Sequence, residues 1–385
     1  MSQEELILLH QKVINFHRVF INWASLNCIY QSAGRNVQRL KLTFVPLYCV
    51  TALLFCVYTA MTTDNQISLF YCIIIAVCFY QCCFKFYCFM VAYRGDFTKM
   101  LEYMEFLTKP TDLPFADEIR GLRLRRNIKF ILWFTKMFVA ASNSIACIVT
   151  LYALSETNYC CPLFFKIPSF IIEEENYLKR PISIIFSCVA YFILVQIMMC
   201  SDSVFFMILA YFEGNLTALV EVIQHLNDTE TAKKDACKIL RYVYEYHCDV
   251  LIHLRIFRRI YWHLNIHFIT TNFIAICLLL FMSRFYESPI ATYLGAGTAI
   301  FQLFFVCFCG QILRNRTEAI GDALYHTRWY EMNRREKITV LIIMTAGQEP
   351  IGLDAGGIMP ISFNTFANVM KTALSYGAIL YTLIE

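Results

Sequence analysis

The sequence predicts an all-α protein, a bundle of seven membrane-spanning helices, and three observations support this prediction. Hydrophobic residues make up 58% of the 385-residue chain, charged residues only 16%, and the mean hydropathy is +0.52. Soluble domains carry about 25% charged residues. The apolar residues gather in seven long runs, and Lys and Arg lie mainly between alternate runs. This composition excludes a disordered chain, a disulfide-rich secreted module and a basic nucleic-acid-binding protein, so no nucleic-acid partner is expected.

The seven apolar runs are each long enough to cross a lipid bilayer. About 20 apolar residues in a helix cross the roughly 30 Å of hydrocarbon. A spanning segment has to satisfy its own backbone hydrogen bonds, so each run is expected to be helical. The last run is the least obvious, because Asn364, Asn368 and Lys371 interrupt it. The predicted spans are 42–62, 67–93, 128–155, 182–212, 264–285, 289–313 and 360–384.

The positions of Lys and Arg predict the direction of the bundle. The positively charged segments, with 26 of the 33 Lys and Arg residues, are 1–41, 94–127 with Lys129, 213–263 and 314–359. The loops that alternate with them hold only 3, and these loops are 63–66, 156–181 and 286–288. Cytoplasmic loops carry the excess of positive charge. We therefore expect a cytoplasmic amino terminus and an extracellular carboxyl terminus, the reverse of a G-protein-coupled receptor.

The amino-terminal segment 1–41 is predicted to contain an amphipathic helix. It carries no secretory signal pattern. Its apolar residues recur at helical spacing, and they are Leu6, Leu9, Val13, Phe16 and Phe20. A helix with one apolar face lies on a membrane surface or packs against the rest of its protein, and the sequence leaves both alternatives open.

Segment 314–359 is too charged to enter lipid, and its first part, 314–345, has a helical pattern. Residues 346–359 then break the helix and make the final span a separate one, because this stretch is rich in glycine and proline: Gly347, Pro350, Gly352, Gly356 and Gly357, with Pro360 after them. One side of that helix presents residues at steps of three and four: Ser375, Tyr376, Ile379, Thr382 and Leu383. Such a stripe fits either helix packing or a pore in which apolar residues form the constriction and hydroxyls face a hydrated ion.

Two charged residues fall within predicted spans at similar depth. Lys85 and Asp202 both lie in the cytoplasmic halves of their helices. A mutual ion pair would lower the free energy of burying them, and contact with water would do the same. Both alternatives remain open from the sequence.

The sequence predicts no enzyme, no cofactor and no metal site. His263 and His267 are four residues apart, a spacing that can bind zinc, but no third ligand follows at a suitable distance. No nucleophile elbow or pair of catalytic carboxylates is present. A transporter is the alternative class for such a chain, although the odd number of spans and the lack of an internal repeat disfavour it.

A family resemblance appears in the carboxyl third of the chain. The residues that show it, in order, are Phe305-Val-Cys-Phe-Cys-Gly310-Gln-Ile-Leu, Ala323-Leu-Tyr325, Trp329-Tyr, Arg334-Arg, Gln348-Glu-Pro350, Ala355-Gly-Gly, Ser362, Phe366 and Leu374-Ser375-Tyr376. In this order and spacing the segment resembles the insect odorant receptors, in the branch of tuning subunits. The related gustatory receptors, which are the alternative, end in Thr-Tyr, five apolar residues and Gln-Phe. The shared odorant co-receptor also has Gln near that end. Here Thr382 stands at the Gln position, which favours a tuning subunit.

The resemblance implies an odorant-gated non-selective cation channel in a cell membrane, in the dendrite of a sensory neuron. Its partners would be a volatile small-molecule odorant, the lipid bilayer, the permeating cations and the common odorant co-receptor, with four subunits around one pore. The corresponding division of the chain is an amino-terminal segment (1–41), spans one to six with the odorant pocket (42–313), a cytoplasmic anchor (314–359) and the pore-lining seventh span (360–385).

The odorant pocket is expected in the outer halves of spans two, three, four and six. A pocket for a volatile ligand is small, mostly apolar and edged by a few polar groups. Aromatic rings there can stack on a planar ligand. The candidate residues are Phe70, Tyr71, Ile74 and Cys78 of span two, Ser142, Asn143, Ala146 and Val149 of span three, Phe186, Ala190, Tyr191 and Leu194 of span four, and Tyr293 of span six.

Overall fold

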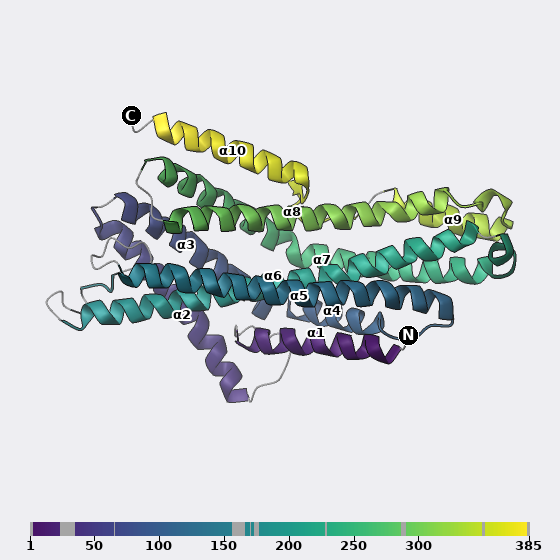
Figure 1. Ribbon diagram of the computed structural model, residues 1–385, viewed down its shortest axis with the longest axis horizontal. Coiled ribbons are helices and arrows are strands. Elements are labelled where there is room, and N and C mark those ends of the chain that lie inside the picture. The colour runs from purple at the N-terminus through teal and green to yellow at the C-terminus, as the bar shows by residue number, and fades with distance from the viewer. Residues whose placement is uncertain are drawn as a thin grey trace.

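The computed structural model describes residues 3–23, 35–64, 66–155, 166–169, 171–172, 177–227, 229–285, 290–348 and 351–382. Within these residues the chain is almost entirely helical, with one two-stranded hairpin (Figure 1). The helices are α1 (Gln3–Trp23), α2 (Arg35–Thr62), α3 (Gln66–Tyr87), α4 (Arg94–Phe106), α5 (Pro114–Ser155), α6 (Lys179–Gln224), α7 (Thr229–Phe285), α8 (Ile290–Tyr325), α9 (Arg334–Gly347) and α10 (Phe363–Thr382). A π-helical turn, Cys88–Ala92, follows α3, and the hairpin joins β1 (Asp354–Ala355) to β2 (Met359–Pro360).

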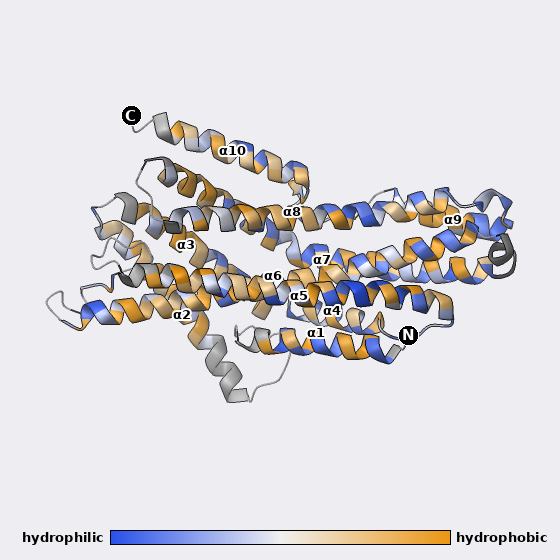
Figure 2. Cartoon of the chain, in the orientation of Figure 1, coloured by the Kyte–Doolittle hydropathy of each residue, from blue (hydrophilic) through white to orange (hydrophobic). Residues whose placement is uncertain are grey.

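Six helices of the described residues are long and apolar enough to cross a membrane: α2, α3 with its π turn, α5, α6, α7 and α8. Figure 2 shows their apolar residues concentrated over one part of the bundle, while the end that contains α9 is mixed in polarity. The seventh predicted span is the 20-residue helix α10. It is not among the six, because Asn364, Asn368 and Lys371 lower its hydropathy.

Several helices continue well beyond the predicted spans. Helices α5, α6 and α7 are 42, 46 and 57 residues long, so most of the expected loops 94–127 and 213–263 are helix. A helix satisfies its backbone hydrogen bonds in water as well as in lipid, and the apolar runs mark only its buried part. Segment 314–345, expected as helix, is helical in two parts with a turn between them. Its first part extends α8 to Tyr325, and α9 then folds back along α8.

The amino-terminal helix α1 packs against α5 and α6, as the second of its two alternatives requires. Leu6 and Val13 are buried in the common core. His10 Nδ1 lies 2.7 Å from the hydroxyl of Tyr211 on α6, and His17 is completely buried. Leu9 and Phe16 are half-buried, so the stripe faces protein from Leu6 to Phe16, and the side chain of Phe20 lies outside the described residues.

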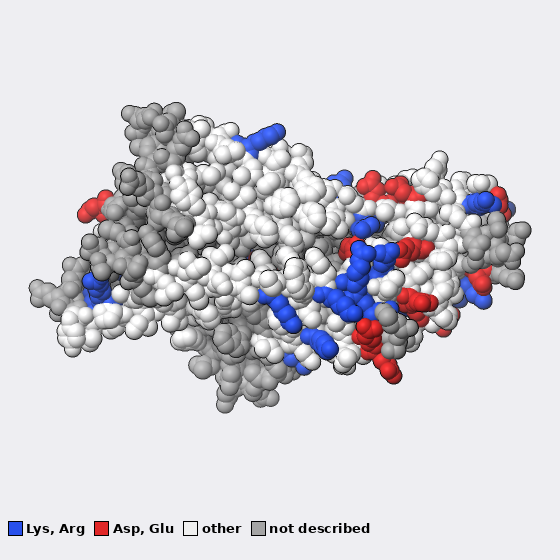
Figure 3. Space-filling model, viewed as in Figure 1, with Lys and Arg blue, Asp and Glu red and all other residues white. Residues whose placement is uncertain are grey.

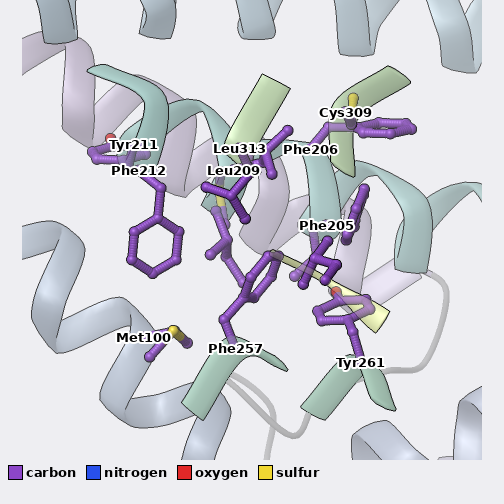
Figure 4. Close-up of a cluster of buried hydrophobic side chains, with 14 of the residues drawn as sticks. Met100, Phe205, Phe206, Leu209, Tyr211, Phe212, Phe257, Tyr261, Cys309 and Leu313 are labelled. Atoms are coloured by element: carbon purple, nitrogen blue, oxygen red, sulfur yellow. The ribbon is translucent and has the colours of Figure 1, made fainter. Parts of the chain in front are cut away.

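The centre of the bundle is an aromatic cluster where α6, α7 and α8 meet (Figure 4). Phe205 of α6 stacks on Phe257 of α7, with 5.7 Å between ring centroids and 20° between planes. Tyr261 lies edge-on to Phe205 at 4.9 Å. Such pairs contribute about 0.5–1.5 kcal/mol each beyond the area they bury. The cluster fixes the three long helices relative to one another.

The hairpin sets the start of α10 against α8. Its turn places Gly356 and Gly357 at φ angles of 61° and 69°, which favour glycine. At Gly310 of α8 a Cβ atom would lie 2.5 Å from the backbone oxygen of Ile361, so only glycine permits this approach. Arg258 of α7 forms an ion pair with Asp354 and holds the hairpin to the bundle.

Candidate functional site

An internal cavity of about 240 Å³ lies between α3, α5, α6, α7 and α8. An engineered apolar cavity of about 150 Å³ binds benzene, so this space suits one small organic molecule. The wall is mainly apolar with a few polar groups, as is typical of a ligand site. Its lining residues are Tyr71, Ile74, Ile75, Val77, Cys78, Gln81, Lys85, Ser142, Ile145, Tyr191, Leu194, Val195, Met198, Met199, Asp202, Phe268, Thr271, Asn272, Ala275, Leu279, Gly295, Thr298, Ala299 and Gln302.

One end of the cavity is closed by contacts between α3 and α8. The hydroxyl of Tyr71 forms a hydrogen bond with the hydroxyl of Thr292, and both residues are buried. Leu279 of α7 packs with Tyr71 in a small apolar cluster and contacts Gly295 of α8. These contacts join α3, α7 and α8 at this end of the cavity.

The other end carries a buried ion pair. Lys85 Nζ of α3 lies 2.6 Å from Asp202 Oδ1 of α6, and their side chains are 7% and 14% exposed. Ser201 donates a further hydrogen bond to Asp202 Oδ1 at 3.3 Å, and the Lys85 ammonium lies 5.7 Å from the ring centre of Phe268. Of the two sequence alternatives for this pair, the structure shows the direct one. The polar amide of Gln81 lies close by in the same wall.

Several predicted pocket residues line this cavity, and they come from three of the four expected spans. The residues are Tyr71, Ile74, Cys78, Ser142, Tyr191 and Leu194. Their place in the cavity wall agrees with the prediction of where the pocket lies, and their contact with a ligand stays a prediction.

Three other predicted residues do not line the cavity. Phe186 packs between Tyr48 and Phe55 of α2, with ring centroids 4.5 and 5.3 Å away. Phe70 lies edge-on to Phe281 of α7 at 5.2 Å. The side chain of Tyr293 is 57% exposed. Phe186 and Phe70 therefore pack against adjacent helices, whereas Tyr293 lies on the outer surface.

Of the remaining predicted residues, three do not line the cavity, and the side chain of the fourth is not described. The amide oxygen of Asn143 accepts a 2.6 Å hydrogen bond from Gln196, so this group bridges α5 and α6. Ala146 and Ala190 are buried but do not line the cavity. The side chain of Val149 lies outside the described residues.

The sequence prediction missed the contribution of α7. Five residues of this helix line the cavity at helical spacing: Phe268, Thr271, Asn272, Ala275 and Leu279. They belong to the fifth predicted span, 264–285, which is not among the spans expected to form the pocket. Polar Thr271 and Asn272 within an apolar span were the available signal. Lys85 and Asp202 were noted as intramembrane charges, which mark functional positions by default.

Helix α10 rests on α7 and α8 by one face only. Ala373 is fully buried, and the thiol of Cys277 on α7 donates to its carbonyl oxygen at 3.8 Å. Three of the predicted stripe residues lie on the exposed side: Ser375, Tyr376 and Ile379, the last two 54% and 52% exposed. The side chain of Thr382 and all of Leu383 lie outside the described residues.

The fold matches solved insect receptors over nearly the whole chain. An olfactory receptor from Machilis hrabei, OR5, solved in complex with eugenol, superposes with a TM-score of 0.82 and 14% identity, covering 98% of this chain and all of that one. A second structure of the same receptor superposes with a TM-score of 0.81 and 15% identity, and the match covers 98% of this chain and 99% of that one. These likenesses show that the chain has the fold of that receptor.

Sequence comparison gives the same family. Odorant receptor 49a of Drosophila melanogaster is 20% identical over 272 residues, 68% of this chain and 66% of the relative. Odorant receptor 59b of the same species is 32% identical over 95 residues, so this match spans about a quarter of each chain. The family model described as 7tm Odorant receptor matches residues 65–374. The chain is therefore a multi-pass membrane protein that belongs to the odorant receptor family.

Proposed function

We propose that this chain is the tuning subunit of an odorant-gated non-selective cation channel, which assembles with the odorant co-receptor as a tetramer in the membrane of a sensory dendrite. The family assignment and the internal cavity support this proposal. The family match also favours an odorant receptor over a gustatory receptor. Thr382, which stands where the co-receptor carries Gln, favours the tuning role.

The ligand in this proposal is a volatile molecule with a mostly apolar body and one or two polar groups. Aromatic and aliphatic side chains of the cavity would surround the body, while Ser142 or Tyr191 would hydrogen-bond its polar atom. Eugenol, which the Machilis receptor was solved with, has this character. A charged ligand would have to disturb the pair formed by Lys85 and Asp202, so neutral ligands are favoured.

One observation carries the link between ligand and pore: a single stretch of α7 touches both. Phe268 and Ala275 line the cavity. On the other side, Cys277 contacts the backbone of Ala373, and the ring of Phe273 lies 6.0 Å from Tyr376 of α10. A ligand that displaces α7 therefore moves the helix that we assign to the pore.

In this proposal the exposed stripe of α10 faces the conduction path. Ile379 and Leu383 would form the apolar constriction, and Ser375, Tyr376 and Thr382 would present polar groups to a hydrated ion. The amino terminus would lie in the cytoplasm, as the Lys and Arg distribution predicts. Segment 314–359 would be the anchor where four subunits meet.

A matched pair of tyrosine variants tests the ligand site. Tyr191 lines the cavity, whereas Tyr293, on α8, is exposed on the outer surface. In cells that express the chain with the co-receptor, Tyr191→Ala is expected to shift the odorant concentration for half-maximal current by about tenfold, because about 1–2 kcal/mol of ring contact is lost. Tyr293→Ala should leave the curve in place.

Responses to a co-receptor agonist provide the control for assembly, and both variants should retain them. Expression of the chain without the co-receptor should give no odorant response, which separates a tuning subunit from a co-receptor and from a gustatory receptor. An unchanged curve for Tyr191→Ala would remove the cavity as the odorant site.

A further inference from the structure

A second cleft, distinct from the internal cavity, opens on the surface between α5, α6 and α8. Its volume is about 670 Å³. One part of its wall is aromatic and aliphatic, with Phe130, Phe305 and Phe308. The other part is polar, with Arg126 and Arg316. The cleft therefore presents an oily section and a charged section to the same occupant.

The change in polarity occurs at one level on all three helices. On α5, Arg126 precedes Phe130 by one turn, and on α6, Leu209 precedes Glu213 by one turn. On α8, Ile312 precedes Arg316 by the same interval. Figure 3 shows Lys and Arg gathered in a band where the uncharged surface meets the charged end of the molecule. The cleft therefore crosses the level at which the surface changes from apolar to charged.

The charged residues that line the cleft have a net positive charge, which Arg126 supplies. Glu213 is already satisfied, since Arg316 lies 3.1 Å from it and Thr217 donates to it at 3.0 Å. Among the basic residues of α5 near this level, Arg123 pairs with Glu221 and Lys129 lies 3.2 Å from Glu5. Arg126 is exposed and has no acidic partner among the described residues.

We propose that this cleft binds an anionic phospholipid of the cytoplasmic leaflet, with its phosphate at Arg126 and its acyl chains along the phenylalanines. Basic pockets between membrane helices on the cytoplasmic side bind anionic headgroups, and an arginine fork matches the geometry of a phosphate. The leaflet assignment rests on the cytoplasmic amino terminus of the proposed function. The apolar wall selects a lipid over a free phosphate ion.

Tryptophan quenching tests this site in the full-length chain. Trp133 of α5 is 60% exposed, and its ring lies 6.3 Å from that of Phe130 in the cleft wall. Phosphatidylserine or phosphatidylcholine with brominated acyl chains is titrated into detergent-solubilised protein, and the fluorescence is recorded. Phosphatidylserine should quench at a concentration about fivefold to tenfold lower than phosphatidylcholine, and 10 mM inorganic phosphate should not reverse the quenching.

Three variants distinguish lipid binding in the cleft from a general effect of the positive charge of the protein. Arg126→Gln should abolish the preference for phosphatidylserine, and Arg126→Lys should retain most of it. Arg335→Gln, which removes an equal charge from an exposed position of α9, should leave the preference unchanged. Equal quenching by the two lipids in the native chain, or a preference that survives Arg126→Gln, would overturn the proposal. Absence of quenching by both lipids would indicate that another protein chain covers this face, and would also overturn it.

Discussion

At the scale of single residues, the ion pair between Lys85 and Asp202 connects α3 to α6 and also forms part of the cavity wall. The two charges lie within membrane-spanning helices and at one end of the cavity. Burying either charge alone is strongly unfavourable, whereas the 2.6 Å contact and the Ser201 hydroxyl compensate Asp202. The cavity therefore has a polar end that is electrically neutral as a whole.

Breaking this pair should destabilise the receptor more than removing Lys136, another lysine within a predicted span. Lys85→Met leaves Asp202 uncompensated and is expected to destabilise the protein by about 3–5 kcal/mol. Lys136→Met, at an exposed position of α5, should have little effect. Surface biotinylation measures the outcome. The charge-swapped variant Lys85→Asp with Asp202→Lys should reach the surface better than either of its single changes, and failure to do so would count against pairing.

His17 predicts a pH dependence of stability. It is completely buried, its Nδ1 lies 2.9 Å from the carbonyl oxygen of Val13, and burial lowers its pKa from 6.5 to about 4. Between these values the unfolded chain binds a proton that the folded chain does not. Stability is therefore complete above pH 6.5 and is lost as the pH falls toward 4, by roughly 3 kcal/mol in all.

The melting temperature of the purified protein at pH 7.5 and pH 5 measures this effect. The decrease should be smaller in His17→Gln, which carries no titrating ring. The matched variant His326→Gln, at an exposed position after α8, should show the full decrease. An identical decrease in His17→Gln would assign the pH dependence to other groups.

At the scale of elements, the junction between α8 and α10 depends on glycine. The backbone of Ile361, just before α10, passes so close to Gly310 that no side chain fits between them. A second close approach joins α8 to α9, where a Cβ atom on Gly347 would lie 3.2 Å from the Cα of Gly321. The carboxyl-terminal third is therefore fixed by backbone contacts as well as by side chains.

Gly310→Ala should displace the start of α10 and reduce both stability and current. The added methyl group has to move a backbone segment, and overpacking of this kind costs about 1–3 kcal/mol. Gly297→Ala is the control on the same helix, because nothing lies within 4 Å of its added Cβ. That change should be neutral or slightly stabilising, since alanine is the better helix former. Thermal unfolding and odorant-evoked current amplitude are the two measurements.

Helix positions were predictable from the sequence, but helix ends and rotations were only partly so. The apolar runs located all six helices that have the length and hydropathy of a span, because burial in lipid requires such runs. They did not reveal that α7 continues for 57 residues, since a polar segment also forms helix. Phe186 and Tyr191 are five residues apart on α6, yet only Tyr191 reaches the cavity. The direction in which each helix faces depends on its neighbours, which periodicity does not identify.

At the scale of the whole molecule, helix α7 lies between an internal cavity and the partly exposed final helix α10. Cavity and α10 lie on different sides of α7, so in the proposed function ligand binding and ion conduction would use separate surfaces of one element. The receptor needs no enzyme or second messenger in this scheme, because the ligand and the pore belong to one assembly. That property distinguishes it from receptors that signal through a separate protein.

Recording from outside-out membrane patches tests this claim most directly. The patches come from cells that express the chain with the co-receptor, and the pipette contains no nucleotide. The account predicts single-channel openings within milliseconds of odorant application, at a higher odorant concentration in the Tyr191→Ala variant and absent when the chain is omitted. Odorant currents that appear only when GTP is supplied, or that occur equally without this chain, would contradict it.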